Sequence, residues 1–181
     1  MAILYLIRHG HTEPSGPDAA TWGLSARGRD QAGRLALAPF WESVGCVWSS
    51  PEEKALWTVQ PAVERYGLKL HTDPRLAEVR RGSEWIEDYE GAVREYLSGN
   101  GPERREPVEA AGERVLECIQ EIECSGQRVA VVSHGLLLTL YLAALDGTDP
   151  FELWRGIAFG RVAVVEDGRL ITHFSDPLKV S

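Results

Sequence analysis

The sequence has few cysteines, no long hydrophobic run and no excess of basic residues. Its three cysteines, Cys46, Cys118 and Cys124, form no CxxC pair, so we expect reduced, mostly buried thiols in a reducing compartment. The longest apolar stretch, residues 136–145, is too short to cross a bilayer. The first residues lack the basic and apolar regions of a signal peptide. These absences predict a cytoplasmic protein.

The charge balance and the missing motifs exclude further classes. With 19 basic and 27 acidic residues the net charge is -8, which opposes binding to nucleic acid and to anionic membranes, so we expect neither partner. The same negative net charge opposes the binding of phosphate esters, so any anion site must be formed by a local group of cationic side chains and N–H donors. The patterns GxGxxG, Walker A and GxSxG are absent, which gives no support to dinucleotide, P-loop or serine-hydrolase chemistry.

Strand and helix signals alternate along the 181 residues, which predicts one α/β domain with a mainly parallel sheet. Short apolar runs indicate strands, and 3.6-residue periodicity or capping residues indicate helices. We expect strands at 3–8, 44–49 and 128–133, helices at 27–39, 51–66, 108–122 and 136–145, and a closing hairpin at 162–166 and 170–174.

Residues 82–107 form the least regular stretch. Helical character at 85–97 is followed by a Gly- and Pro-containing loop at 98–102 and a charge run at 103–106. We expect an exposed, mobile segment that acts as a lid, rather than a boundary between domains. Residues 1–181 then form a single domain.

Two predicted strands end in the same way, with a histidine followed by a glycine. Strand 3–8 leads into His9-Gly10, and strand 128–133 leads into His134-Gly135. Ligands of open α/β sheets bind outside the carboxyl ends of the strands, so the two histidines face each other there if the strands are neighbours. Each glycine lets the backbone approach a ligand and leaves its N–H free for an anion. The pattern predicts an anion site.

Five blocks, in this order, resemble those of the histidine phosphatase (phosphoglycerate mutase-like) superfamily. They are RHG at 8–10, the Leu-Ser to Gln-Ala stretch at 24–32, SSPEEKALWT at 49–58, LAE at 76–78 and VVSHG at 131–135. The resemblance implies a three-layer α/β/α fold with a mainly parallel central sheet. It also implies a phosphatase that acts on a small-molecule phosphomonoester without cofactor or metal.

The resemblance also implies roles for individual residues. His9 is the nucleophile that becomes a phosphohistidine, and Glu78 is the acid that protonates the leaving group. His134 and Arg8 stabilise the transferring phosphoryl group. The phosphate-binding residues would be Arg8, Lys54, Gly10 and Gly135, with Arg80 as a further candidate.

Glu78 must hold a proton near neutral pH to serve as an acid. Burial or nearby carboxylates would raise its pKa sufficiently. Glu84, Glu87 and Asp88 lie close in sequence and could supply that repulsion or act in its place.

Lys54 stands where the family usually has arginine. Lysine keeps the charge but lacks the planar fork that binds two phosphate oxygens. Either Lys54 binds phosphate as a point charge, or Arg80 or Arg81 enters the pocket. A third interpretation is a non-catalytic phosphate-binding module that has lost turnover at this position.

Two further alternatives concern the reaction. The residues after His11 lack the Trp-Asn of the glycolytic mutases, which favours a phosphatase over a phosphoglycerate mutase-type phosphotransferase without excluding transfer between substrates. An HxH metal site is disfavoured because the cations Arg8 and Lys54 would repel a divalent ion. The sequence leaves the substrate and the oligomeric state open, with a homodimer among the options.

Overall fold

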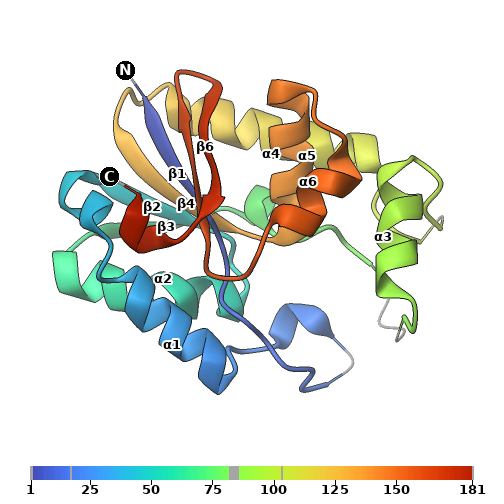
Figure 1. The fold of residues 1–181 in the computed structure, drawn as a ribbon, viewed down its shortest axis with the longest axis horizontal. Coiled ribbons are helices and arrows are strands. Elements are labelled where there is room, and N and C mark those ends of the chain that lie inside the picture. Colours follow the sequence, from blue (N-terminus) through green and yellow to red (C-terminus); the bar gives the residue numbers. More distant parts are fainter. Residues whose placement is uncertain (1, 17, 82–85, 103, 181) are drawn as a thin grey trace.

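A six-stranded mixed sheet forms the centre of the computed structural model, which describes residues 2–16, 18–81, 86–102 and 104–180 (Figure 1). The strand order is β3-β2-β4-β1-β5-β6. Strands β3, β2, β4 and β1 run parallel to one another. Strand β5 runs antiparallel to β1, and β6 runs antiparallel to β5. The strands span β1 Ile3–Arg8, β2 Cys46–Ser49, β3 Lys69–Thr72, β4 Arg128–Ser133, β5 Val162–Glu166 and β6 Arg169–Ser175. The predicted mainly parallel sheet is confirmed.

Helices cover both faces of this sheet, so the predicted three-layer α/β/α architecture is confirmed. In Figure 1, α1 and α2 lie on one side of the sheet, and α4, α5 and α6 lie on the other. The helices span α1 Ala26–Leu35, α2 Glu53–Tyr66, α3 Tyr89–Leu97, α4 Val108–Glu123, α5 Gly135–Asp146 and α6 Pro150–Gly156.

The central strand β1 serves two hydrophobic cores. Its side chains alternate between the faces of the sheet. Leu4 and Leu6 pack in the core that contains α4 and α5, whereas Tyr5 and Ile7 pack in the core that contains α1 and α2. All four are buried. A continuous apolar run is what a strand covered on both faces requires.

Several element boundaries differ from the sequence prediction. The expected helix 27–39 ends at Leu35, and Pro39 instead begins a short 3-10 helix, Pro39–Ser43, because the fixed φ of proline suits the first position of a helix. The edge strand β3 was not expected, since it has no buried residue and therefore no apolar run. The short helix α6 was also missed. The closing hairpin is confirmed, and its turn residues Asp167 and Gly168 have φ of 44° and 72°.

The segment 82–107 differs in part from the expected exposed lid. Of its residues, 82–85 and 103 lie outside the described part, and so does the alternative acid Glu84. Helix α3 packs against α6. Arg105 and Glu106 are buried, contrary to the expectation for the charge run, because both make polar contacts that compensate the loss of water. Action as a lid stays a prediction.

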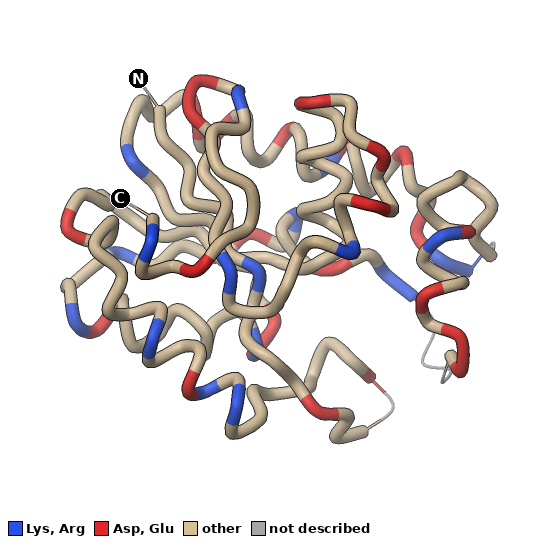
Figure 2. The backbone as a smooth tube through the Cα atoms, viewed as in Figure 1, with Lys and Arg blue, Asp and Glu red and all other residues tan. Residues whose placement is uncertain are grey.

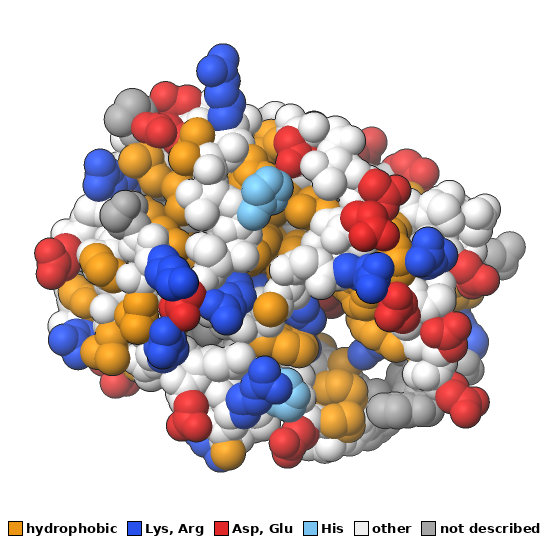
Figure 3. Space-filling model, in the orientation of Figure 1, with side chains coloured by type: hydrophobic (Ala, Val, Ile, Leu, Met, Phe, Trp, Pro, Cys, Tyr) orange, Lys and Arg blue, Asp and Glu red, His pale blue; other side chains and the backbone are white. Residues whose placement is uncertain are grey.

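The surface carries charges of both signs. Basic and acidic residues are interspersed along the backbone in Figure 2, and they alternate with hydrophobic side chains on the face drawn in Figure 3. All three cysteines are unpaired, but only Cys118 is fully buried and Cys124 is exposed, which corrects the expectation of mostly buried thiols. Within the described ranges, no helix combines the length and the apolarity that a membrane span requires.

Candidate active site

The pairing of β1 with β4 brings the two predicted histidines together. The strands are parallel neighbours, and Arg8 at the end of β1 is in register with Ser133 at the end of β4. The next residues, His9 and His134, are therefore side by side. Their ring centroids lie 5.0 Å apart, and the backbone N–H of His9 donates to the carbonyl oxygen of Ser133 at 3.0 Å. The convergence expected from the sequence is present.

His9 has the tautomer that a nucleophile requires. Its Nδ1 lies 2.7 Å from the carbonyl oxygen of Gly10, which can only accept a hydrogen bond, so the ring proton is on Nδ1. The lone pair is then on Nε2. Burial, together with the charges of Arg8 and Lys54, lowers the pKa of His9 to about 3. The ring is consequently neutral at physiological pH.

His134 is fully buried and has one nitrogen bonded and one without a partner. Its Nε2 shares a hydrogen bond with Ser50 Oγ at 2.8 Å and lies 3.3 Å from Glu52 Oε1. Its Nδ1 is a buried atom without a hydrogen-bond partner in the described part of the chain. Burial lowers the pKa of His134 well below its usual value, and the neighbouring His9 and Lys54 add to this effect. With both partners at Nε2, the neutral ring carries its proton on Nε2 and its lone pair on Nδ1.

Arg8 is fixed from several sides beside the histidines. Its Nη1 donates to the carbonyl oxygen of Ile157, and its Cζ lies 3.8 Å from the centroid of the Phe159 ring. The Phe159 ring also lies 5.3 Å from the ring of His9. Nε of Arg8 is a second buried nitrogen without a partner among the described residues. An anion next to His9 could accept a hydrogen bond from this Nε of Arg8.

Lys54 lies in the first turn of α2 and its side chain is 6% exposed. Its Nζ donates to the carbonyl oxygen of Ala19 at 2.6 Å and forms an ion pair with Glu52 Oε2 at 2.7 Å. The positive charge of Lys54 lowers the pKa of both His9 and His134, which places it close to the pair. Lysine therefore provides the site with a buried cation.

The carboxylate of Glu78 lies at the start of α5, the helix that begins directly after His134. Its carboxylate accepts hydrogen bonds from the backbone N–H groups of Val79, Leu136 and Leu137 at 2.9 to 3.3 Å. Burial raises the pKa of Glu78, and the negative charge of Glu52 raises it further. The raised pKa is the property that a general acid needs near neutral pH.

The two glycines provide space rather than a pair of free donors. The N–H of Gly10 donates to Thr58 Oγ1 at 2.8 Å, so the expectation that it is free for an anion is wrong. A Cβ on Gly10 would lie 2.9 Å from the carbonyl oxygen of Gly28, and a Cβ on Gly135 would lie 3.1 Å from Arg8 Cζ. Gly135 thus allows the guanidinium of Arg8 to lie against the first turn of α5.

The structure does not bring Arg80 to this cluster. Its side chain is 83% exposed, and its guanidinium lies 3.8 Å from Glu106 Oε1. Arg81 lies over the ring of Tyr89, with Cζ 5.2 Å from the centroid. Asp88, an alternative acid from the sequence, accepts from the N–H of Gly91 and caps α3. Of the basic residues weighed for the phosphate, Arg8 and Lys54 are the ones beside the histidines.

Three neighbours of the cluster were not identified from the sequence. Ser50 and Glu52 contact His134, and Phe159 lies against Arg8. Glu52 and Lys54 stand two positions apart in the block 49–58, so a carboxylate next to the substituted arginine position was an available signal. Phe159 follows α6 in a loop that carries no recognisable pattern.

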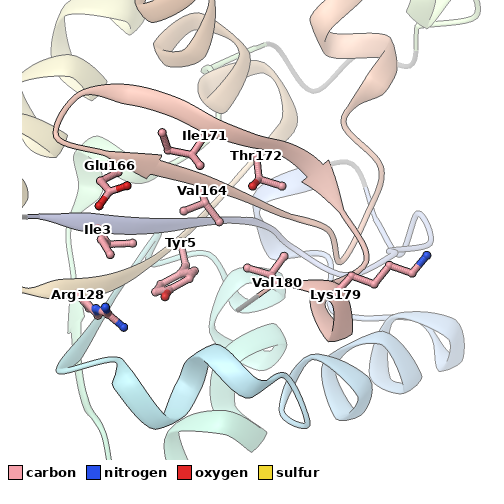
Figure 4. A pocket seen from close by; sticks show the side chains of 9 residues that line it. All are labelled: Ile3, Tyr5, Arg128, Val164, Glu166, Ile171, Thr172, Lys179 and Val180. Carbon is pink, nitrogen blue, oxygen red and sulfur yellow. The ribbon is translucent and has the colours of Figure 1, made fainter.

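The hollow drawn in Figure 4 is separate from the cluster. It is lined by Ile3 and Tyr5 in the first half of β1, whereas His9 follows the end of that strand. It contains no histidine. Across the described residues no group of three or more His, Cys, Asp or Glu side chains is arranged to hold a metal ion.

Solved structures share this fold over nearly the whole chain. YhfR from Bacillus stearothermophilus is 24% identical, with a TM-score of 0.78 over 100% of this chain and 98% of that chain. The alpha-ribazole phosphatase from Shigella flexneri is 24% identical, with a TM-score of 0.76 over 99% and 98%. A mutant phosphoserine phosphatase from Entamoeba histolytica in complex with phosphoserine is 18% identical, with a TM-score of 0.74 over 98% of each chain.

These identities establish the fold, whereas the family follows from the sequence match. A search of curated proteins gave no significant match. The family model of the histidine phosphatase superfamily (branch 1) matches residues 4–166. That stretch includes both histidines, Arg8, Lys54 and Glu78. The chain belongs to the histidine phosphatase superfamily, branch 1.

Proposed function

We propose that the protein is a metal-independent phosphatase that hydrolyses a small-molecule phosphomonoester through a phosphohistidine on His9. The observation that carries the proposal is the 5.0 Å separation of the His9 and His134 rings beside the unpartnered nitrogen of Arg8. Phosphoryl transfer needs a positioned nucleophile and compensation of the charge on the equatorial oxygens. The cluster offers both within one buried space.

In the first step, the lone pair on Nε2 of His9 attacks phosphorus and forms a P–N bond. The bond from phosphorus to the ester oxygen breaks, and its electron pair stays on that oxygen. Glu78 donates its proton there, so the product leaves as an alcohol. Arg8, Lys54 and His134 stabilise the charge on the phosphoryl oxygens, a type of contribution worth about 10²–10³ in rate for each donor.

In the second step, water replaces the alcohol and attacks the phosphohistidine. Glu78, now a carboxylate, accepts a proton from the water as the new P–O bond forms. The P–N bond breaks, and its electron pair returns to Nε2 of His9. Inorganic phosphate leaves, and both residues regain their starting protonation states.

The class of substrate follows from the relatives and from the chemistry of the cluster. Two structural relatives, an alpha-ribazole phosphatase and a phosphoserine phosphatase, are enzymes for small phosphate esters. The cluster pairs one candidate nucleophile, His9, with the nearby cations Arg8 and Lys54, which fits the transfer of one phosphoryl group from a monoester. We place the reaction in the cytoplasm because the chain carries three unpaired cysteines.

Turnover of p-nitrophenyl phosphate in the presence of EDTA tests the proposal. The wild-type protein should release phosphate between pH 5 and 8, as expected from the neutral His9, and His9→Ala should not. Release that requires an added metal ion, or equal release by His9→Ala, would contradict it. Transfer of phosphate to an acceptor without net release would instead identify a phosphotransferase, and phosphate binding without turnover would identify a non-catalytic module.

A further inference from the structure

Glu52 connects three parts of the site with one side chain. Its Oε2 lies 2.7 Å from Lys54 Nζ, and its Oε1 lies 3.3 Å from His134 Nε2. Oε1 also accepts a hydrogen bond from the backbone N–H of Glu78 at 2.8 Å. The carboxylate therefore contacts Lys54 of α2, His134 after β4 and the backbone of Glu78.

The burial of Glu52 makes these contacts costly to lose. Its side chain is 10% exposed, and a carboxylate removed from water needs both ion pairing and hydrogen bonding. Each of its oxygens has a partner within the cluster. A charge held in this way has little freedom to rotate, so the groups that contact it are fixed as well.

The contact with His134 determines which nitrogen is available to a phosphate. Ser50 and Glu52 both lie at Nε2, so the proton of the neutral ring is on that atom, and Nδ1 has no hydrogen-bond partner among the described residues. Nδ1 can donate to a phosphate oxygen only when it is protonated, which makes the ring an imidazolium. A carboxylate next to Nε2 stabilises that cation once the phosphate arrives.

We propose that Glu52 is a positioning residue for phosphoryl transfer, which orients Lys54 and His134 toward the phosphate and keeps a negative charge beside the acid Glu78. The inference rests on the proposed function, because it concerns the same reaction. Glu52 does not touch the reacting atoms and acts through its three neighbours. It is therefore distinct from the residues that bind or attack the substrate.

Several charged groups set the protonation of Glu78, and Glu52 is one of them. Arg8 from the end of β1 lowers the pKa of Glu78, and Glu52 raises it. Tyr89 of α3 is coupled to the same carboxylate, and Arg114 of α4 donates to the carbonyl oxygen of Glu78 at 3.3 Å. Removal of the Glu52 charge leaves the cations unopposed, so Glu78 would lose its proton at lower pH.

The test compares Glu52→Gln with two matched variants. Glu53→Gln removes the same charge from the next residue, which is exposed, and Glu52→Asp keeps the charge on a shorter side chain. With an alkyl phosphate as substrate, Glu52→Gln should lower kcat by about 10- to 100-fold, less than the about 10²–10³-fold expected for loss of a direct donor. The alkaline limb of its pH–rate profile should move to lower pH. Glu52→Asp should retain the wild-type limb, and Glu53→Gln should match wild type throughout.

A second readout does not depend on turnover. The pKa of His134, followed by NMR in the presence of inorganic phosphate, should fall in Glu52→Gln and stay unchanged in Glu53→Gln. A Glu52→Gln protein with the wild-type pH limb and the wild-type pKa of His134 would overturn the inference, even if its kcat is lower. An inactive wild-type protein would instead contradict the proposed function, while the NMR result would still decide the role of Glu52.

Discussion

The guanidinium of Arg8 stacks on the ring of Phe159, with Cζ 3.8 Å from the ring centroid. Arg8 also lies against Gly135, where an added Cβ would lie 3.1 Å from Cζ. The loop after α6 and the start of α5 thus both contact one cation, next to His9. A residue distant in sequence from the family's motif blocks sets the position of a central group.

The stack predicts a measurable role for Phe159 in the reaction. Phe159→Leu keeps an apolar side chain but removes the ring, whose interaction with a cation is worth about 0.5–2 kcal/mol. We expect kcat/KM for p-nitrophenyl phosphate to fall about 2- to 30-fold with the fold unchanged by circular dichroism. Phe174→Leu, in strand β6 and outside the cluster, is the matched control. Equal kinetics for wild type and Phe159→Leu would show that Arg8 is held without the ring.

Lys54 should carry part of the phosphate binding despite the loss of the arginine fork. Lys54→Ala removes a buried cation close to both histidines, so kcat/KM should fall about 10²–10³-fold and the inhibition constant of inorganic phosphate should rise. Lys69→Ala, an exposed lysine of β3, serves as the control and should have no effect. Wild-type kinetics in Lys54→Ala would instead favour a different cation at the phosphate.

Glu78 should determine the alkaline limb of the pH–rate profile. The acid must be protonated, and burial raises its pKa, so activity toward an alkyl phosphate is full below that pKa and is lost as the pH rises through it. Glu78→Gln should lower kcat for glycerol phosphate by about 10²–10⁴-fold and abolish this limb. It should affect p-nitrophenyl phosphate far less, because nitrophenolate leaves without a proton. Equal losses for both substrates would contradict the role of acid.

Arg114 should stabilise the fold around the acid. Its guanidinium bonds both oxygens of Glu106, at 2.7 and 2.8 Å, and donates to the carbonyl oxygens of Arg75 and Ala77. Arg114→Met removes the guanidinium that pairs both oxygens of the buried Glu106 and leaves it with the contacts from Arg80, which should lower the free energy of unfolding by about 3–5 kcal/mol. Urea denaturation checks this value. Arg27→Met, at an exposed position of α1, should change it by less than about 0.5 kcal/mol.

The histidine pair could be predicted from the sequence, on the condition that the two strands are neighbours, because the residues at a strand end are a local property. Each apolar run ends in a His-Gly pair, and two buried parallel strands place their ends at the same edge. The register of Arg8 with Ser133 then brings His9 to His134 without further information. Lys54 and Glu78 were located differently, through the resemblance of their blocks to those of the family.

The contacts across the site could not be predicted, because they depend on long-range packing. Phe159 contacts Arg8 from a loop 151 positions later in the sequence. The buried positions of Arg105 and Glu106 depend on Arg114 and on Ala92 as partners, which a charge run does not reveal. Strand β3 pairs with β2 through backbone bonds and a stack of His71 on Trp48, and it has no apolar pattern. Tertiary partners decided each of these cases.

Detection of the covalent intermediate tests the central claim most directly. The protein is mixed with p-nitrophenyl phosphate, quenched rapidly without acid and digested for peptide mass spectrometry at alkaline pH. A phosphoryl group should be found on the peptide that contains His9. Stability of this group in alkali but not in acid should identify it as a phosphohistidine. The label should be absent from His9→Ala. A phosphoryl group on another residue, or turnover by wild type with no labelled peptide at any quench time, would contradict the account.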